Sequence, residues 1–357
     1  MTRERMGKEF YKDTDRLKQL YSEAVGEDIQ QARDEELPGH VKFLRLFSAL
    51  TQRLNPTRRL LFGLSVVSFL AYYLFGFLQI TGFVIFYDLL VPFAFGSMLM
   101  LLLVELLEKS DVKREIDLAR EIQLSLLPNT EHTRDQLEMF SFANTAKEVG
   151  GDYVDIIETD DGTYIVIADV SGKGLSAALY MVRMQALVHL IIEKSQPSPK
   201  ELFLELNNYV KSDIKDKTFV TACVAFFPKG EDNFLFARAG HNAPILFSKE
   251  RDATFDLRSD GYALGMTSSA NLKHQLQQKK FHFKPGDSVL FYTDGLTEAR
   301  NEFGEEYGSD RLDAILSVYG SLHSKSIIRK IQSSLENFIG NEKPADDVTF
   351  TCVHLNE

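Results

Sequence analysis

The sequence predicts an α+β protein: a domain of layered, largely antiparallel sheets and helices, preceded by a two-helix transmembrane hairpin and a linker helix. Three observations support this organisation. The stretch 60–104 contains a single charged residue, Asp88. From about residue 130 onward, short β-branched and aromatic runs alternate with Gly, Asp and Asn, as strands and turns do. These runs outnumber the helical segments between them, which excludes a simple alternation of parallel strands and crossover helices.

Composition and charge exclude several functional classes. The chain has 357 residues, enough for about two domains, and its net charge of −11 argues against a nucleic-acid partner. The two cysteines, Cys223 and Cys352, lie far apart, and the eight histidines show no zinc-binding spacing. We therefore expect two reduced core cysteines and no histidine-rich zinc site.

Residues 58–107 form the predicted membrane region. The apolar stretch is too long for one bilayer span of about 20 residues and fits two, which we place at about 60–78 and 89–107. Basic residues flank both spans and are absent from the connecting loop. We therefore expect a multi-pass protein of the plasma membrane with both chain ends in the cytoplasm, and Asp88 at the far interface. The alternative is one buried helical hairpin in a soluble core.

Two helical segments flank this hairpin. Residues 1–57 are charged and are expected to be mostly helical and cytoplasmic; within them, 41–54 has an apolar face that suits either the membrane surface or the packing face of a small helical hairpin. Residues 108–129 form the linker helix, which Pro128 ends. Its apolar stripe would be uncovered on a plain spacer, so we expect it to pack on a partner helix, most simply in a homodimer, or on the following domain. The stripe consists of Val112, Ile116, Ala119, Ile122 and Leu126.

The domain at 130–357 contains six runs with strand character and four helical segments. The strands are expected at 164–170, 219–227, 233–240, 243–248, 288–295 and 348–355. The helices are expected at 175–194, 199–215, about 309–320 and 323–339. This order favours antiparallel sheets that are flanked by pairs of helices.

Acidic residues recur where these strands meet flexible turns. They are Asp152 and Asp155 after a double glycine, Asp169 at the end of YIVIA, Asp294 after SVLFYT, and the pair Asp346–Asp347 before VTFTCV. Each by itself is typical of a turn residue that bonds to its own backbone. Four such groups without a matching set of cations indicate carboxylates that converge on hard divalent ions such as Mg²⁺ or Mn²⁺.

These acidic residues, together with the motifs that the sequence lacks, limit the reactions that the site could catalyse. Two such ions about 3.5–4 Å apart can activate a water molecule and bind a phosphoryl oxygen, and the sequence has no G-x-S-x-G or cysteine–histidine nucleophile signature. The turn Gly172–Gly174 is not a Walker A loop, because Ile167 stands where the first glycine belongs and Gly174 where Ser or Thr belongs. A cyclase or nucleotidyl transferase would need such a triphosphate-binding loop. The residues therefore predict a metal-dependent phosphoester hydrolase.

Seven motifs, in order over roughly residues 119–355, resemble those of the PPM-type metal-dependent serine/threonine protein phosphatases. They are similar to the bacterial branch typified by sporulation stage II protein E and the regulators of the general stress response. The motifs are AREIQLSLLPN, EVGGDYVDI, ADVSGKGLSAAL, FVTACVAFF, RAGHNAPILF, PGDSVLFYTDGLTEARNEFGEEYGSDRL and ADDVTF. The resemblance implies a four-layer α/β/β/α sandwich with a centre of two divalent cations, Mn²⁺ or Mg²⁺.

The resemblance also implies roles for individual residues. The catalytic metal ligands would be Asp152, Asp169 as the bridge, the carbonyl of Val170, Asp294, and Asp346, with Asp347 as the alternative to Asp346. Gly151 and Gly172 would allow backbone to approach metal or phosphate closely. Ser171 stands where the wider family has a histidine that is a candidate acid. His241, followed by Asn242, is expected to organise a turn.

Substrates of this branch are typically phosphoserine or phosphothreonine on anti-sigma-factor antagonist proteins in the cytoplasm. The resemblance therefore implies a membrane-anchored protein serine/threonine phosphatase that acts on a phosphorylated cytoplasmic regulatory protein. The linker helix, through Ile116, Ala119, Ile122 and Leu126, would relay a signal to the domain. The alternative is a catalytically silent, membrane-tethered adaptor that binds the same partner.

Overall fold

The computed structural model describes residues 55–77, 84–128, 130–213, 218–340, 342 and 344–356. The chain divides into two compact units, Met1–Val112 and Lys113–Glu357. The predicted helical region 1–57, including its amphipathic segment 41–54, lies outside the described residues up to residue 54. Of the predicted loop 79–88, residues 79–83 also lie outside them, whereas 84–88 are helical and open the helix that contains the predicted second span.

The first unit contains α3 (Pro56–Phe77) and most of α4 (Val84–Leu126). The Ser65 hydroxyl donates a hydrogen bond to the Ala94 carbonyl over 2.8 Å, and the Arg58 guanidinium forms ion pairs with Glu105, over 3.4 Å, and with Glu108. One continuous helix thus covers both the predicted second span and the predicted linker. Among the described residues, two helices are long and apolar enough to cross a membrane: Leu89–Leu126 and Leu175–Ser195.

The second unit contains two sheets whose strand pairs are all antiparallel. The first sheet has the order β1 (Glu131–Arg134), β2 (Leu137–Asn144), β11 (Val348–Leu355), β10 (Ser288–Tyr292), β7 (Ile245–Ser248), β8 (Ala253–Asp256). The second has the order β3 (Asp152–Glu158), β4 (Gly162–Val170), β5 (Val220–Pro228), β6 (Asn233–Ala239), β9 (Gln278–His282).

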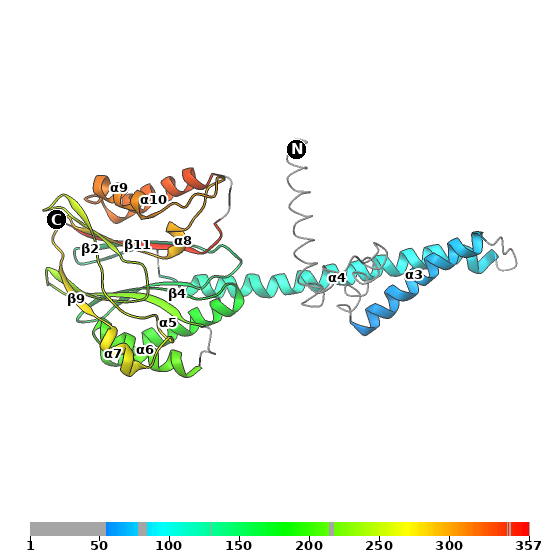
Figure 1. Ribbon diagram of the computed structural model, residues 1–357, viewed down its shortest axis with the longest axis horizontal. Helices are drawn as coiled ribbons and strands as arrows, with labels where there is room; N and C mark the ends of the chain where they lie inside the picture. The colour runs from blue at the N-terminus through cyan, green and yellow to red at the C-terminus, as the bar shows by residue number, and fades with distance from the viewer. Residues whose placement is uncertain are drawn as a thin grey trace, which may run out of the picture. The chain divides into compact units, whose positions relative to one another are not determined.

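Helices cover the outer face of each sheet (Figure 1). Against the five-stranded sheet lie α5 (Leu175–Ser195), α6 (Pro199–Asp213) and α7 (Ser269–Gln275). Against the six-stranded sheet lie α9 (Ser309–Tyr319) and α10 (Ser324–Ile339), and the short α8 (Asp294–Thr297) follows β10. The predicted α+β class and its α/β/β/α layering are therefore confirmed.

Strand β4 contains an uninterrupted apolar segment, Tyr164–Ala168, and its surroundings explain why. Ile165 and Ile167 belong to the core between the two sheets, whereas Tyr164, Val166 and Ala168 belong to the core under α5. Successive side chains of a strand point to opposite faces, so a strand covered on both faces is apolar at every position. The polar residue Asp169 marks the point where this double covering ends.

All six predicted strands and all four predicted helices of the domain are present. The other five strands of the domain and its short helices α7 and α8 were not predicted. The helix expected at 199–215 is described as far as Asp213. Strands β1, β2, β3, β8 and β9 were missed. Their burial patterns are mixed or their runs are short, except for β3, which is buried along most of its length but begins with aspartate.

Candidate metal centre

Asp152 and Asp169 lie side by side at one end of the five-stranded sheet. Asp152 opens β3 and Asp169 is the last residue but one of β4, and the antiparallel register makes their Cα atoms direct partners. Side chains that are opposite each other in such a pair lie on the same face. Their two carboxylates therefore point to a common region.

The six-stranded sheet brings Asp294 to the same place. Asp294 opens α8 directly after β10. The hydroxyl of the preceding residue, Thr293, donates to Asp152 Oδ2 over 2.8 Å, and its backbone N–H donates to the Thr349 carbonyl over 2.9 Å. Thr293 thus connects the ends of the two sheets and fixes the orientation of the Asp152 carboxylate.

The two members of the Asp346–Asp347 pair have different surroundings. Asp347 accepts backbone hydrogen bonds from Ala146 N over 2.8 Å and from Gly151 N over 2.7 Å. Asp346 Oδ2 instead lies 2.6 Å from Lys173 Nζ, and its side chain is half exposed. Asp347 therefore holds the glycine turn before β3, while Asp346 presents its carboxylate towards the centre.

The four acidic groups perturb one another electrostatically. Burial, followed by the charge of Asp169, raises the pKa of Asp152 well above its ordinary value. Burial and then the charges of Asp294 and Asp346 raise the pKa of Asp169 to about 7. Burial and Asp346 also raise the pKa of Asp294. Lys173, which pairs with Asp346 over 2.6 Å and acts to lower the pKa of Asp169 and Asp294, therefore compensates the negative charge at this end of the domain only in part.

The donor set fits a hard divalent cation. It consists of oxygen atoms only, and Mg²⁺ and Mn²⁺ prefer carboxylate and carbonyl oxygens. Among the described residues, no three acidic, histidine or cysteine side chains stand close enough together to hold an ion. The charge of a bound ion would offset the repulsion that raises the pKa values of these side chains.

The predicted backbone positions lie next to these carboxylates. A Cβ atom on Gly151 would stand 2.9 Å from the Val170 carbonyl oxygen and 3.6 Å from Asp169 Oδ1, so only glycine allows this approach. Gly172 has a φ of +106°, a conformation that favours glycine. Ser171 Oγ accepts a hydrogen bond from Phe219 N over 2.9 Å, which ties the loop after β4 to β5.

His241 lies farther from the carboxylates. Its Nδ1 is 2.9 Å from the hydroxyl of Thr221, which is itself the cross-strand partner of Asp169. The Arg238 guanidinium donates to the His241 carbonyl over 2.5 Å, and burial lowers the pKa of His241 to about 4. These contacts support the predicted turn-organising role for His241; Asn242 follows it and is half-buried.

Sequence reasoning did not assign a role in the centre to Lys173. Its Nζ donates to the Ala345 carbonyl over 3.0 Å as well as pairing with Asp346. The loop Ser171–Gly174 is thereby attached to the loop before β11. The available signal was the lysine between Gly172 and Gly174, which the motif analysis used only to exclude a Walker A loop.

Gln123 of α4 was also missed. Its side-chain amide donates to the Gly150 carbonyl over 2.6 Å and accepts from Gly150 N over 3.1 Å, and Gln123 is buried. It lies one turn beyond Ala119 and two turns beyond Ile116, both half-buried, and before the half-buried Leu126. Ile122, which was assigned to the same apolar stripe, is exposed in the single chain. Helix α4 is thus bonded directly to the glycine turn that Asp347 also holds.

Comparison with known proteins gives a consistent result. The family model described as stage II sporulation protein E (SpoIIE) matches residues 159–356. The phosphoserine phosphatase RsbU of Bacillus subtilis is 27% identical over 227 residues, which are 64% of this chain and 66% of that protein. The phosphoserine phosphatase RsbP of the same organism is 27% identical over 252 residues, 69% of this chain and 59% of that protein. The matches thus span less than two thirds of these relatives' own lengths.

A solved structure shows the same fold. The SiaA-PP2C domain of Pseudomonas aeruginosa superposes with a TM-score of 0.60 at 20% sequence identity, and the match covers 70% of this chain and 99% of that domain. At this identity the likeness establishes the fold alone. The second unit therefore has the PP2C fold.

Proposed function

Because the chain belongs to the stage II sporulation protein E family and its second unit has the PP2C fold, we propose that it is a metal-dependent protein serine/threonine phosphatase. The observation that carries this proposal is the meeting of Asp152, Asp169, Asp294 and Asp346 at one end of both sheets, with raised pKa values on the first three. The names of RsbU and RsbP, both phosphoserine phosphatases, agree with it.

We assign the cation ligands to Asp152, Asp169, the Val170 carbonyl, Asp294 and Asp346, and propose two ions, Mn²⁺ or Mg²⁺. Bound divalent ions at such a site supply an activated water molecule and stabilise the charge on a phosphoryl group. The chain's own residues position this machinery. Thr293 orients Asp152, Asp347 fixes Gly151, and Lys173 holds Asp346 through the 2.6 Å contact.

We further propose that the substrate is a phosphorylated cytoplasmic regulatory protein of the anti-sigma-factor antagonist class. The names of RsbU and RsbP, both phosphoserine phosphatases, support a phosphoserine substrate, and the antagonist class is what the resemblance of the sequence motifs implies. The glycine-rich loop Ser171–Gly174 contributes a single lysine, Lys173, which is paired with Asp346, and this suits a phosphomonoester on a protein better than the triphosphate of a nucleotide.

The membrane anchor and the signalling route are proposals of the same kind. The apolar part of α4, Leu89 onward, is long enough to cross a bilayer, and we propose that α3 and α4 form a two-span anchor with both chain ends in the cytoplasm. The same helix α4 then continues to Gln123 and its bonds with Gly150. A change in the pairing of α4, for example in a homodimer, or its rotation would move the glycine turn at Gly150. This movement would change the affinity of the centre for its metal ions.

The test uses the full chain purified in detergent micelles. We expect phosphate release from p-nitrophenyl phosphate and from phosphoserine peptides that requires Mn²⁺ or Mg²⁺ and stops when a chelator is added. Absence of turnover with both metals, together with retained binding to a phosphorylated protein, would favour the adaptor instead.

A further inference from the structure

Phe303 is the most exposed large apolar side chain among the described residues, with 79% of its surface accessible. It lies at the tip of a turn, 298–308, that follows α8 directly. An aromatic side chain of this size loses favourable burial when it remains in water. Its exposure at the tip of the turn therefore leaves it available for contact with a partner.

The turn that carries Phe303 is rigidly built. The Asn301 carboxamide oxygen accepts hydrogen bonds from Phe303 N and from Glu305 N, each over 3.0 Å. A bridge pairs Arg300 with Glu306, whose side chains form a 2.7 Å ion pair. Because these contacts already order the tip in the free protein, little conformational entropy would be lost when a partner contacts it.

The root of this turn is attached to the candidate metal centre. Glu298 N donates to the Asp294 carbonyl over 2.8 Å, and Gly308 N donates to the Thr297 carbonyl over 2.8 Å. Burial and then the charges of Asp294, Glu306 and Asp346 raise the pKa of Glu298, so the turn lies within the electrostatic field of the centre. A protein whose phosphoryl group reaches Asp294 would therefore come close to the root of the turn.

The length of the turn 298–308 and its charge indicate what kind of partner it could bind. The five Cα–Cα steps from Glu298 to Phe303 span at most about 18 Å, a distance that a folded phosphoprotein can bridge while its phosphorylated residue is in the centre. The turn is also acidic, with four glutamates and Arg300; the glutamates are Glu298, Glu302, Glu305 and Glu306. Its charge complements a partner surface with an apolar depression and basic residues around it.

We propose that the turn 298–308, through Phe303, is a docking element that selects the phosphoprotein substrate. This inference rests on the proposed phosphatase function and adds a determinant of specificity that lies outside the metal ligands. The phosphoprotein buries Phe303 in its own surface while the centre hydrolyses the phosphomonoester. Phe303 therefore affects recognition of the protein and leaves the hydrolysis of small substrates unchanged.

The experiment compares the full chain in detergent micelles with Phe303→Ala and Phe303→Leu. Two substrates are used: p-nitrophenyl phosphate, and the phosphoproteins of a cytosolic extract of the source organism, in which single phosphosites are quantified over time by mass spectrometry. We expect unchanged hydrolysis of the small substrate. At the phosphosites that the wild type clears, we expect at least a tenfold slower rate in Phe303→Ala, the scale of an aromatic hot spot, and an intermediate rate in Phe303→Leu.

The matched control is Val318→Ala, because Val318 on α9 is another apolar side chain that is 68% exposed; it should change neither rate. Equal phosphosite rates for Phe303→Ala and wild type would refute the inference, and so would an equal loss on both substrates. A changed oligomeric state by light scattering without a phosphosite effect would assign the turn to a second copy of the chain. If the wild type hydrolyses neither substrate, the proposed function fails, and the inference fails with it.

Discussion

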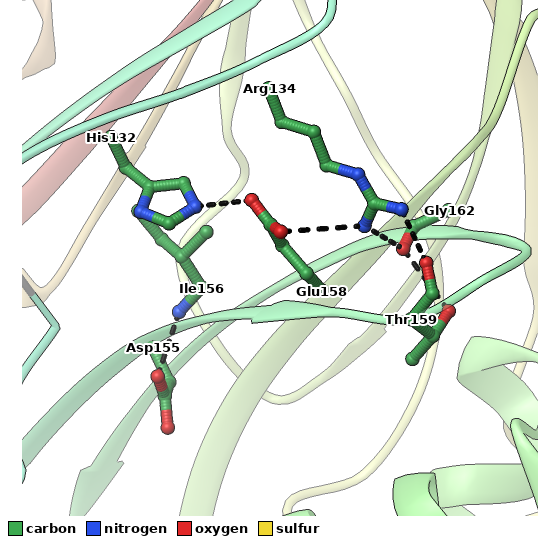
Figure 2. Close-up of polar contacts among 7 residues, drawn as sticks. All are labelled: His132, Arg134, Asp155, Ile156, Glu158, Thr159 and Gly162. Atoms are coloured by element: carbon green, nitrogen blue, oxygen red, sulfur yellow. Dashed lines mark hydrogen bonds and ion pairs between the residues drawn. The ribbon is translucent and has the colours of Figure 1, made fainter.

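The two ends of the β3–β4 pair contain similar residues in opposite electrostatic states. At one end, Asp152 faces Asp169. At the other end, the Glu158 carboxylate lies 2.5 Å from His132 Nε2 and 3.9 Å from Arg134 Nη1. The same arginine donates to the carbonyls of Thr159 and Gly162 over 2.5 and 3.0 Å, as Figure 2 shows.

The difference shows that the neighbours of a carboxylate, and not its place at a strand end, separate a structural acid from a functional one. Glu158 lies at the end of a hairpin next to Arg134 and His132, as an ordinary structural residue does. Asp152 is stabilised by hydrogen bonds with Thr293 and Thr349, and Lys173 acts on Asp169, but the other charged groups that act on these two carboxylates are acids. A cluster whose charges are so incompletely compensated lowers stability unless a ligand compensates it, so its presence indicates a binding role.

The largest effect should come from Asp169→Asn at the acidic end. Loss of this carboxylate should lower Mn²⁺-dependent hydrolysis of p-nitrophenyl phosphate by roughly 10³-fold, the scale on which main electrostatic contributors to catalysis act. The same change should raise the melting temperature of the chelator-treated chain, because it removes a charge that Asp294 and Asp346 repel. If Asp169→Asn kept activity close to that of the wild type, the Asp152–Asp169 end would not be functionally different from the Glu158 end.

The stability of the metal-free chain should depend on pH through the same residue. Burial and Asp294 raise the pKa of Asp169 to about 7 from 3.8. The folded chain therefore keeps a proton that the unfolded chain releases near pH 4, and the associated stability is present below about pH 4 and lost as the pH rises through about 7.

We expect the stability advantage of Asp169→Asn over wild type to grow across this pH range, by at most about 1.4 kcal/mol for each pH unit. Thermal unfolding of both chains from pH 4 to 8 in chelator measures it. Buried His241, whose pKa is lowered to about 4, acts in the opposite direction, between about pH 4 and 6.5, but it is common to both chains and cancels in their difference. A pH-independent difference would contradict the raised pKa.

Gln123→Ala tests the contact between α4 and the acidic end. The change leaves the buried N–H and carbonyl of Gly150 without their partners, which costs about 1–3 kcal/mol. Because Gly150 precedes Gly151 and Asp152, we expect the Mn²⁺ concentration for half-maximal activity to rise about tenfold. Ser125→Ala, on an exposed position of α4, is the control, and equal metal requirements of Gln123→Ala and wild type would rule out coupling through this contact.

The smallest effect should come from the opposite end of the strands. Glu158→Gln removes the partly exposed ion pair with Arg134 and alters the hydrogen bond with His132, and an exposed pair of this kind contributes roughly 0–1 kcal/mol. We expect a slightly lower melting temperature and unchanged metal-dependent turnover. A loss of turnover comparable with that of Asp169→Asn would show that charge anywhere on β3 and β4 matters, and the comparison of the two ends would no longer hold.

Much of this architecture could be read along the chain. The segment Tyr164–Ala168 of β4 is apolar at every position because it is covered on both faces, and Asp169 follows it directly. The ends of β10 and the start of β11 are marked by Asp294 and by the Asp346–Asp347 pair in the same way. Local periodicity and the abrupt change from apolar to acidic residues indicated the α+β class and the four acidic groups, whereas the four-layer arrangement and the individual ligand roles were implied by the family resemblance.

The contacts between distant segments were decided only in the folded chain. Asp347 holds Gly151 across 196 positions of sequence, and Lys173 reaches Ala345 across 172. Gln123, the polar residue on the buried side of α4, looked like an ordinary solvent-facing glutamine until the helix was placed against Gly150. The sequence by itself therefore determined which acids end which strands, because that depends on local pattern. Which neighbours each acid receives depends on strand register and loop packing between remote parts of the chain, and only the tertiary structure decided it.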